Sequence, residues 1–278
     1  METRSRSFYI LAAFFGLFVL FLYGPILTIG ILSFQGPQGG LTFPMNGVSL
    51  YWFRDLFQEQ AVGDIWGSFR RSFALGLMVM VTTVVVSVLG GLAFRKRFAG
   101  SGLLFYLAVT SLVIPSILVS LGVGLIFNQL GLPVHWASSG FGSQLTWTLP
   151  FGLLIMFAIF NRFDKSYEEA ARDLGATAWQ TFAHVVLPII APSLLGVALF
   201  GFTLSYDEFA RTLMTAGSYN TLPLEIFGMT TNVTTPVIFA LGTLTTGFSL
   251  VVIGVFFLTV WLMARKKDRG SDAGKGMV

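Results

Sequence analysis

The sequence predicts an all-α membrane protein with six transmembrane helices, and three observations support this fold class. Hydrophobic residues make up 54% of the 278 residues and charged residues only 11%, whereas a soluble domain carries about 25% charged residues. Apolar runs recur along the chain at the length of roughly 20 residues that a helix needs to cross a bilayer. The charged residues fall in short clusters between these runs, as in the loops of a membrane protein.

Six apolar segments are predicted to span the membrane. They lie at residues 8–34, 73–94, 103–130, 145–161, 189–206 and 237–264. The first is far longer than the roughly 7–15 residues of a signal-peptide core, so we expect it to be retained as a helix. Pro115, Pro150 and Pro192 lie inside or near these segments. We expect kinks there rather than breaks, because neighbouring helices satisfy the freed carbonyls.

Basic residues predict that both termini lie in the cytoplasm, the side on which Lys and Arg accumulate. Inner segments then hold thirteen of them and outer loops four. The inner ones are Arg4, Arg6, Arg95, Lys96, Arg97, Arg162, Lys165, Arg172, Arg265, Lys266, Lys267, Arg269 and Lys275, and the outer ones are Arg54, Arg70, Arg71 and Arg211.

Three parts of the chain are predicted from this topology. Residues 1–71 form an N-terminal transmembrane helix and an outer loop, in which aromatic residues at helical spacing over 49–57 predict a short interfacial helix. Residues 72–264 form a core transmembrane domain that contains an inner loop at 162–188, and residues 265–278 form a cytoplasmic tail.

Several functions are disfavoured by the residues themselves. The chain has no Cys, so it has neither disulfides nor thiolate metal sites, and we expect no metal site. Its two histidines, His135 and His184, are far apart in sequence and belong to no HExxH motif, which argues against an intramembrane protease. The basic residues form no single patch of the kind that binds nucleic acid. A channel or a structural subunit remains an alternative to a transporter.

The inner loop carries the most informative local pattern, which predicts two short helices joined by a bend. Ser166 with Glu169 has the spacing of a capping box at the start of a helix. Gly175 suits the left-handed cap at its end. Thr177 with Gln180 repeats the capping pattern for a second helix.

The second short helix is expected to end at Pro188, before the fifth span. A plain connector needs no such fold, so the small residues Ala170, Ala171 and Gly175 suggest a surface for close approach by another protein. Glu169 offers a charge for a partner's Arg. An ordinary amphipathic re-entry helix is the alternative interpretation.

The residues Glu169-Ala170-Ala171, Gly175, Val185 and Leu187-Pro188, at their spacing, resemble the EAA loop of binding-protein-dependent ABC importer permeases, with Val185 where the family pattern has Ile. In that family the loop is the coupling helix that docks in a cleft of the cytoplasmic ATPase. The resemblance implies a type I importer (MetI-like) permease fold with five core helices and one added N-terminal helix.

The same resemblance implies a non-catalytic permease of the bacterial inner membrane that works by alternating access. ATP and Mg are bound by a partner ATP-binding subunit dimer. A second homologous permease and a periplasmic substrate-binding protein complete the expected complex.

Further motifs at residues 202–208, 221–226 and 95–98, with Gly217 and Pro236, are similar to the spermidine/putrescine permease subgroup, which commonly has Asn where Phe239 stands. A polyamine is therefore the expected substrate. Relatives carry opines, phosphonates or thiamine, so another small amine, opine, organophosphonate or other solute remains the alternative.

Carboxylates at the outer end of the fifth span suggest where a cationic substrate passes. Asp207 and Glu208, beside Tyr206, are the candidate substrate-path residues, because ionisable groups near a span are frequently functional. Consecutive helical residues point about 100° apart, so only one of the two is expected to face the path. Glu225 is a further acidic residue nearby. The alternative role for these carboxylates is that of solvated groups at a helix end. Arg70, Arg71 and Arg211 suit an anionic substrate equally well.

Overall fold

The computed structural model describes residues 5–57, 63–96, 98–232 and 235–275, and these ranges are built from helices with one isolated β-bridge between Gln35 and Val48. The chain divides into two compact units, and each is described by itself. One unit comprises Met1–Gly63 with Ile226–Leu250, and the other comprises Asp64–Glu225 with Val251–Val278.

Five stretches of helix in the described residues are long and apolar enough to cross a membrane. They are Arg6–Leu32, Ile65–Phe94, Trp136–Arg162, Ala178–Tyr206 and Val237–Met263. They correspond to the predicted first, second, fourth, fifth and sixth spans. The all-helical membrane fold is therefore confirmed.

The predicted third span, 103–130, is divided, which corrects the expectation of a mere kink at Pro115. Helix α4 (Ser101–Thr110) ends before this proline, and helix α5 (Ser116–Gln129) begins directly after it. Proline has no N–H to donate and keeps the preceding residue out of the helical region, so the helix does not continue through it. The Ser111 hydroxyl lies 2.7 Å from the Ala108 carbonyl and 2.6 Å from the Thr146 carbonyl, so it can donate to either. The contact with Thr146 holds the break against the neighbouring helix α6 (Phe141–Arg162).

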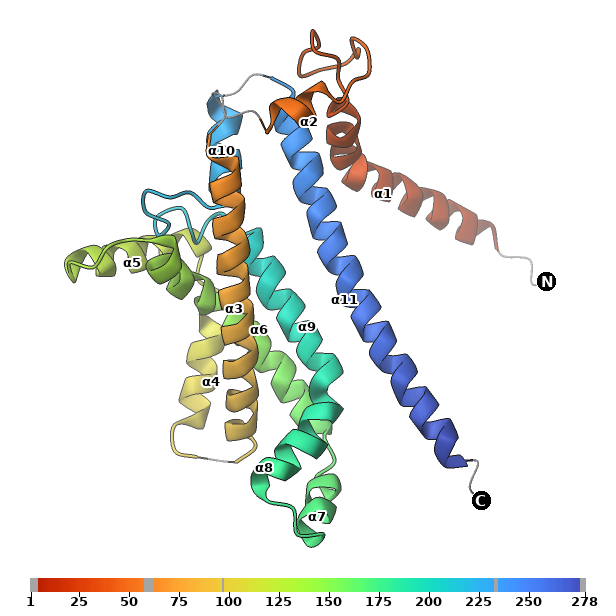
Figure 1. The fold of residues 1–278 in the computed structure, drawn as a ribbon, viewed down its shortest axis with the longest axis vertical. Coiled ribbons are helices and arrows are strands. Elements are labelled where there is room, and N and C mark those ends of the chain that lie inside the picture. The colour runs from red at the N-terminus through yellow and green to blue at the C-terminus, as the bar shows by residue number, and fades with distance from the viewer. Residues whose placement is uncertain (1–4, 58–62, 97, 233–234, 276–278) are drawn as a thin grey trace. The chain divides into compact units, whose positions relative to one another are not determined.

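Three helices form the centre of the larger unit (Figure 1). Helix α3 (Ile65–Phe94) packs against both α9 (Leu187–Tyr206) and α6 (Phe141–Arg162), and α6 packs against α9. A short π-helical segment, η1 (Trp136–Gly140), leads into α6. Helices α6 and α9 continue through Pro150 and Pro192, so the expectation of unbroken helices holds at these two prolines.

Small residues allow these helices to approach closely, as is common in membrane bundles. A Cβ atom at Gly91 would lie 2.8 Å from the Phe160 ring, so only glycine permits this contact between α3 and α6. The Thr83 hydroxyl donates to the Thr148 hydroxyl (3.0 Å) across the same pair of helices. The apolar core beside them comprises Val88, Met156, Phe160, Val186, Ile190 and Val197.

In the smaller unit, the outer loop after α1 (Arg6–Leu32) is held by its own contacts. A helix forms within the predicted stretch 49–57 but is shorter, α2 (Tyr51–Asp55), and its place at the membrane interface stays a prediction. The Trp52 side chain is buried and its indole N–H donates to the Gly36 carbonyl (3.3 Å). Helices α10 (Leu222–Asn232) and α11 (Val237–Lys275) follow later in the chain, and residues of each belong to both units. Helix α11 extends beyond the predicted end of the sixth span.

Candidate functional site

The inner loop forms the predicted bend between two short helices, α7 (Ser166–Asp173) and α8 (Ala178–Thr181). Gly175 adopts the left-handed conformation with φ of 85°, and its N–H donates to the Arg172 carbonyl (2.8 Å). Gln180 N donates to the Thr177 hydroxyl (3.3 Å), and Thr177 N donates to the Gln180 side chain (2.8 Å). The predicted cap at Gly175 and the second capping box are therefore confirmed.

The predicted capping box at Ser166 is wrong. Ser166 is the first helical residue of α7, and the residue before it makes no side-chain cap bond. Asp164 takes the role instead, because its short carboxylate accepts a hydrogen bond from Ser166 N (2.9 Å) in an Asx-type turn. This backbone hydrogen bond also lowers the pKa of the Asp164 carboxyl.

Pro188 does not separate the second short helix from the fifth span, which corrects a further expectation. Helix α8 continues through a π-helical segment, η2 (Phe182–Val186), directly into α9. Pro188 lies in the first turn of α9, directly after the π-helical segment. The helix is therefore continuous from Ala178 to Tyr206.

The inner loop presents large apolar side chains that sequence reasoning missed. Leu174 is 90% exposed and Trp179 is 72% exposed. Exposed apolar patches mark contact sites for other molecules, whereas single exposed apolar residues are common at protein surfaces. No local pattern signals this exposure, because it depends on which other elements pack against the loop. We call Leu174, Gly175 and Trp179, with the exposed Glu169 and Ala170, the elbow surface.

An ion pair anchors the start of α7 to the inner end of α3. Arg95 Nη1 lies 2.5 Å from Glu168 Oε1, and the two side chains are only 14% and 15% exposed. Glu169, one residue later, is exposed. The Glu168 carboxylate is therefore engaged with α3, whereas Glu169 is open to solvent.

The three candidate substrate-path residues lie in different environments at the outer end of α9. Tyr206 is buried, and its ring stacks on that of Phe202 at 5.7 Å between centroids. Asp207 is exposed. Glu208 is half-buried and accepts a hydrogen bond from Arg211 N (3.0 Å). Of the two carboxylates, Asp207 is the more open to solvent.

Arg211, named above as a residue suited to an anionic substrate, is 1% exposed. Its Nη1 donates to the Thr146 hydroxyl (2.6 Å), and its guanidinium lies 5.2 Å from the centroid of the Trp147 ring. The Ser143 hydroxyl donates to its carbonyl (2.9 Å). These contacts fasten the loop after α9 to α6, and they hold the Arg211 charge inside the protein.

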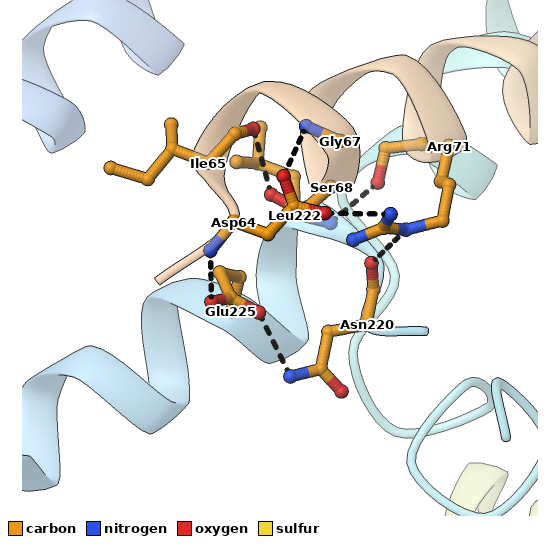
Figure 2. Close-up of polar contacts among 9 residues, drawn as sticks. Asp64, Ile65, Gly67, Ser68, Arg71, Asn220, Leu222 and Glu225 are labelled. Atoms are coloured by element: carbon orange, nitrogen blue, oxygen red, sulfur yellow. Dashed lines mark hydrogen bonds and ion pairs between the residues drawn. The ribbon is translucent and has the colours of Figure 1, made fainter. Parts of the chain in front are cut away.

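A second polar cluster, the outer clasp, joins the start of α3 to the start of α10 through Asp64, Arg71, Asn220 and Glu225 (Figure 2). Glu225 accepts hydrogen bonds from Asp64 N (3.0 Å) and the Asn220 amide (2.8 Å). Arg71 donates to the Asp64 carboxylate (2.9 Å) and to the Asn220 carbonyl (2.7 Å). Glu225 and Arg71 were both considered above as contacts for substrate. In the structure, both side chains are hydrogen-bonded to Asp64 and Asn220.

The outer clasp also caps α3. Asp64 accepts a hydrogen bond from Gly67 N (2.9 Å), so the helix begins at Ile65 rather than near the predicted residue 73. Arg70 and Arg71 consequently lie inside the helix and not at its end. The hydrogen bond from Arg71, followed by that from Gly67, lowers the pKa of the Asp64 carboxyl.

Neither histidine has a surrounding that suggests metal binding. His135 Nδ1 accepts a hydrogen bond from Ala137 N (3.2 Å), and His184 Nδ1 lies 3.1 Å from the Gln180 carbonyl. Across the described ranges, no group of three or more His, Asp and Glu is placed to hold a metal ion.

Comparison with known proteins identifies the family to which this arrangement belongs. The family described as binding-protein-dependent transport system inner membrane component matches residues 84–265. The chain is 30% identical to the spermidine/putrescine transport system permease protein PotC of Haemophilus influenzae, over 88% of this chain and 94% of that protein. It is 28% identical to the putrescine transport system permease protein PotI of Escherichia coli (strain K12), over 91% of this chain and 90% of that protein.

A solved structure shows the same fold. A chain of a bacterial ABC transporter involved in the import of the acidic polysaccharide alginate matches with a TM-score of 0.65 and 19% identity, over 94% of this chain and 99% of that chain. The predicted type I importer fold is thereby confirmed. Permease subunits of this kind are non-catalytic, since the ATPase is a separate subunit. The chain belongs to the binding-protein-dependent transport system inner membrane components and is a permease subunit of an ABC importer.

Proposed function

We propose that this permease subunit imports a polyamine, spermidine or putrescine, by alternating access. The proposal is supported by the names of the relatives, which are polyamine permeases and match about nine-tenths of the chain. It is also supported by the outer end of α9, where the Asp207 carboxylate is exposed, directly after the buried Tyr206. A polyamine carries several positive charges, and carboxylates and aromatic faces compensate such charges when water is removed.

We also propose that the permease is coupled to ATP hydrolysis in a partner subunit, and the elbow surface is the observation that supports this. Glu169, Ala170, Ala171 and Gly175 are the proposed docking residues for an ATP-binding subunit, with Leu187 and Pro188 at the start of α9 as the connection to the membrane. Leu174 and Trp179 add exposed apolar area, which is what a partner's cleft buries most favourably. Closure of the ATPase dimer moves this surface, and the continuous helix from Ala178 to Tyr206 carries the movement inward.

Asp207 is the proposed pathway carboxylate, with Tyr206 as its aromatic neighbour and Glu208 in a supporting role. Glu208 already accepts a hydrogen bond from Arg211 N and lies beside a buried guanidinium, so its charge is partly compensated within the chain. Asp207 is exposed and makes no comparable use of its charge for capping the loop. Because of this difference, we propose that Asp207, and not Glu208, provides the charge that contacts the substrate.

The complete transporter in this proposal contains a dimer of ATP-binding subunits, a second homologous permease and a periplasmic substrate-binding protein. The chain lies in the bacterial inner membrane among lipids with both termini in the cytoplasm. ATP and Mg belong to the partner ATPase. The division of the chain at residues 71 and 264 into an N-terminal part, a core and a tail stays a prediction.

Uptake into vesicles tests the substrate. The complete transporter, reconstituted with its binding protein outside and ATP inside, is given labelled spermidine, putrescine, an opine and an organophosphonate in separate assays. We expect ATP-dependent accumulation of spermidine or putrescine only. Accumulation of the opine or the organophosphonate without either polyamine would replace the proposed substrate by that compound and leave the importer role intact.

A further inference from the structure

Arg95 is the residue at which the inner ends of three helices meet. It is the C-terminal cap of α3, and its Nη1 lies 2.5 Å from the Glu168 carboxylate in the first turn of α7. The centre of its guanidinium lies 5.2 Å from the ring centroid of Phe160, near the end of α6, and 5.3 Å from that of Phe163, which follows α6. One side chain therefore connects α3, α6 and α7.

The Arg95–Glu168 ion pair differs from an ordinary ion pair at the surface in its shielding and in the orientation of its side chains. Both side chains are largely shielded, at 14% and 15% exposed, so water and salt screen their attraction less than at an open surface. The planar guanidinium can stack on aromatic rings and bind a carboxylate at its edge at the same time, which an ammonium group cannot do. The Arg95 side chain is thus fixed in direction from two sides.

The position of the link matters because of what each end contacts. Helix α7 packs on α8 and η2, which belong to its own loop, and α8 carries part of the elbow surface. Helix α3 packs along α9 and α6, so it is the central helix of the larger unit. The ion pair therefore joins α7, which lies in the loop with the elbow surface, to α3, which packs against both α6 and α9.

We propose that Arg95 is a positioning residue for energy coupling: its ion pair with Glu168 transmits movement of the elbow surface to α3. This inference rests on the proposed docking of the elbow surface to an ATPase. Movement then enters the membrane domain at two places, through the continuous helix from Ala178 to Tyr206 and through the Arg95–Glu168 pair. With the pair broken, α7 moves without α3, and ATP hydrolysis is no longer matched by transport.

The surroundings offer a matched control. Leu92, Arg95, Lys96, Lys165, Glu168, Glu169 and Arg172 line a hollow of about 330 Å³ between α3 and α7. Lys96 is exposed and stands next to Arg95 at the same helix end. Replacing Lys96 removes one positive charge from the hollow but leaves the Arg95–Glu168 pair in place. A general effect of charge in the hollow is thereby separated from the effect of the pair.

The test compares Arg95→Gln, Glu168→Gln and Lys96→Gln in the reconstituted complete transporter, with spermidine uptake and ATP hydrolysis measured together. We expect both pair variants to assemble and hydrolyse ATP, with uptake per ATP reduced about fivefold or more, the scale of a typical coupling between sites. Lys96→Gln is expected to behave as the unmodified protein. The exchange Arg95→Glu with Glu168→Arg is expected to recover most of the lost coupling, and Arg95→Lys to be intermediate.

A distance measurement gives a second readout that depends on no particular solute. Spin labels at Ala99→Cys and Asp173→Cys, both exposed positions in a chain without native cysteine, report the separation of the turn between α3 and α4 from α7. In the unmodified background this distance is expected to stay narrow and nearly constant when ATP binds. With Arg95→Gln it is expected to broaden and to change with ATP.

The outcomes separate this inference from the proposed docking. Normal uptake per ATP and an unchanged distance in both pair variants, alongside a transport defect in Gly175→Val, would overturn the inference alone. Normal transport by Gly175→Val as well would overturn the docking proposal. Failure of the pair variants to assemble, without rescue by the exchange, would make the pair a folding contact and would likewise overturn the inference.

Discussion

Replacing Gly175 with Val is expected to abolish transport while the protein still inserts in the membrane. Gly175 has φ of 85°, in the left-handed region. An L-residue there costs roughly 1–2 kcal/mol, and a β-branched residue is a marked outlier. The bend between α7 and α8 relaxes by changing its angle, which moves Leu174 and Trp179 away from their places on the elbow surface.

The measurement is uptake by the reconstituted complex, together with the amount of ATPase that co-purifies. We expect uptake to fall about tenfold or more, since about 1.4 kcal/mol lost from a docking equilibrium is a factor of ten. Gly175→Asn is the matched control, because Asn tolerates the left-handed conformation far better than Val and should retain most activity. Glu169→Lys, which reverses an exposed charge without touching the backbone, should also disrupt docking. Normal transport by Gly175→Val would show that the coupling assignment is wrong.

Replacing Asp207 with Asn is expected to reduce polyamine uptake about tenfold, because a charge-assisted contact to the cation, worth roughly 1.5–3 kcal/mol, is lost. Basal ATP hydrolysis should persist, since the change lies at the opposite end of the helix from the elbow surface. Vesicle uptake of labelled spermidine measured beside the ATPase rate separates these two effects.

Glu208→Gln is the matched comparison at the next position. The Gln side-chain oxygen can still accept the hydrogen bond from Arg211 N that Glu208 accepts at 3.0 Å, so the loop is expected to keep its fold and most of its uptake. If the order is reversed, with Glu208→Gln inactive and Asp207→Asn normal, Glu208 is the pathway carboxylate. If both variants transport normally, the carboxylates are solvated helix-end groups and the support for a cationic substrate reduces to family resemblance.

The fold could be predicted from the sequence wherever an element depends on residues that lie close together in the chain. Long apolar runs gave five spans, and the Thr177 capping pattern and Gly175 gave the bend of the inner loop, because capping depends on neighbours a few residues apart. The break at Pro115 was missed, since its stabilising contact comes from Thr146 on another helix. The start of α3 was missed as well, because Asp64 caps a stretch with Arg70 and Arg71 that lies before the apolar run.

The candidate functional site could be predicted only in part, because several of its contacts join residues that are far apart in the sequence. The coupling motif is a contiguous stretch and could be recognised from its spacing. The link from Arg95 to Glu168 joins residues 73 positions apart, and no local pattern indicates it. The roles of Glu225 and Arg71 in the outer clasp depend on Asn220 and Asp64, so these side chains looked available in the sequence and are engaged in the structure.

Site-directed cross-linking tests the central claim, an elbow surface that docks to an ATPase, most directly. The chain has no native Cys, so a photoreactive maleimide can be placed at Leu174→Cys or Trp179→Cys alone in the assembled transporter. Tyr219→Cys, also an exposed aromatic position at 56% but in the loop after α9, is the control. We expect strong cross-links from Leu174 and Trp179 to the ATP-binding subunit and none from Tyr219. Cross-links to that subunit from Tyr219, with none from Leu174 or Trp179, would contradict this claim.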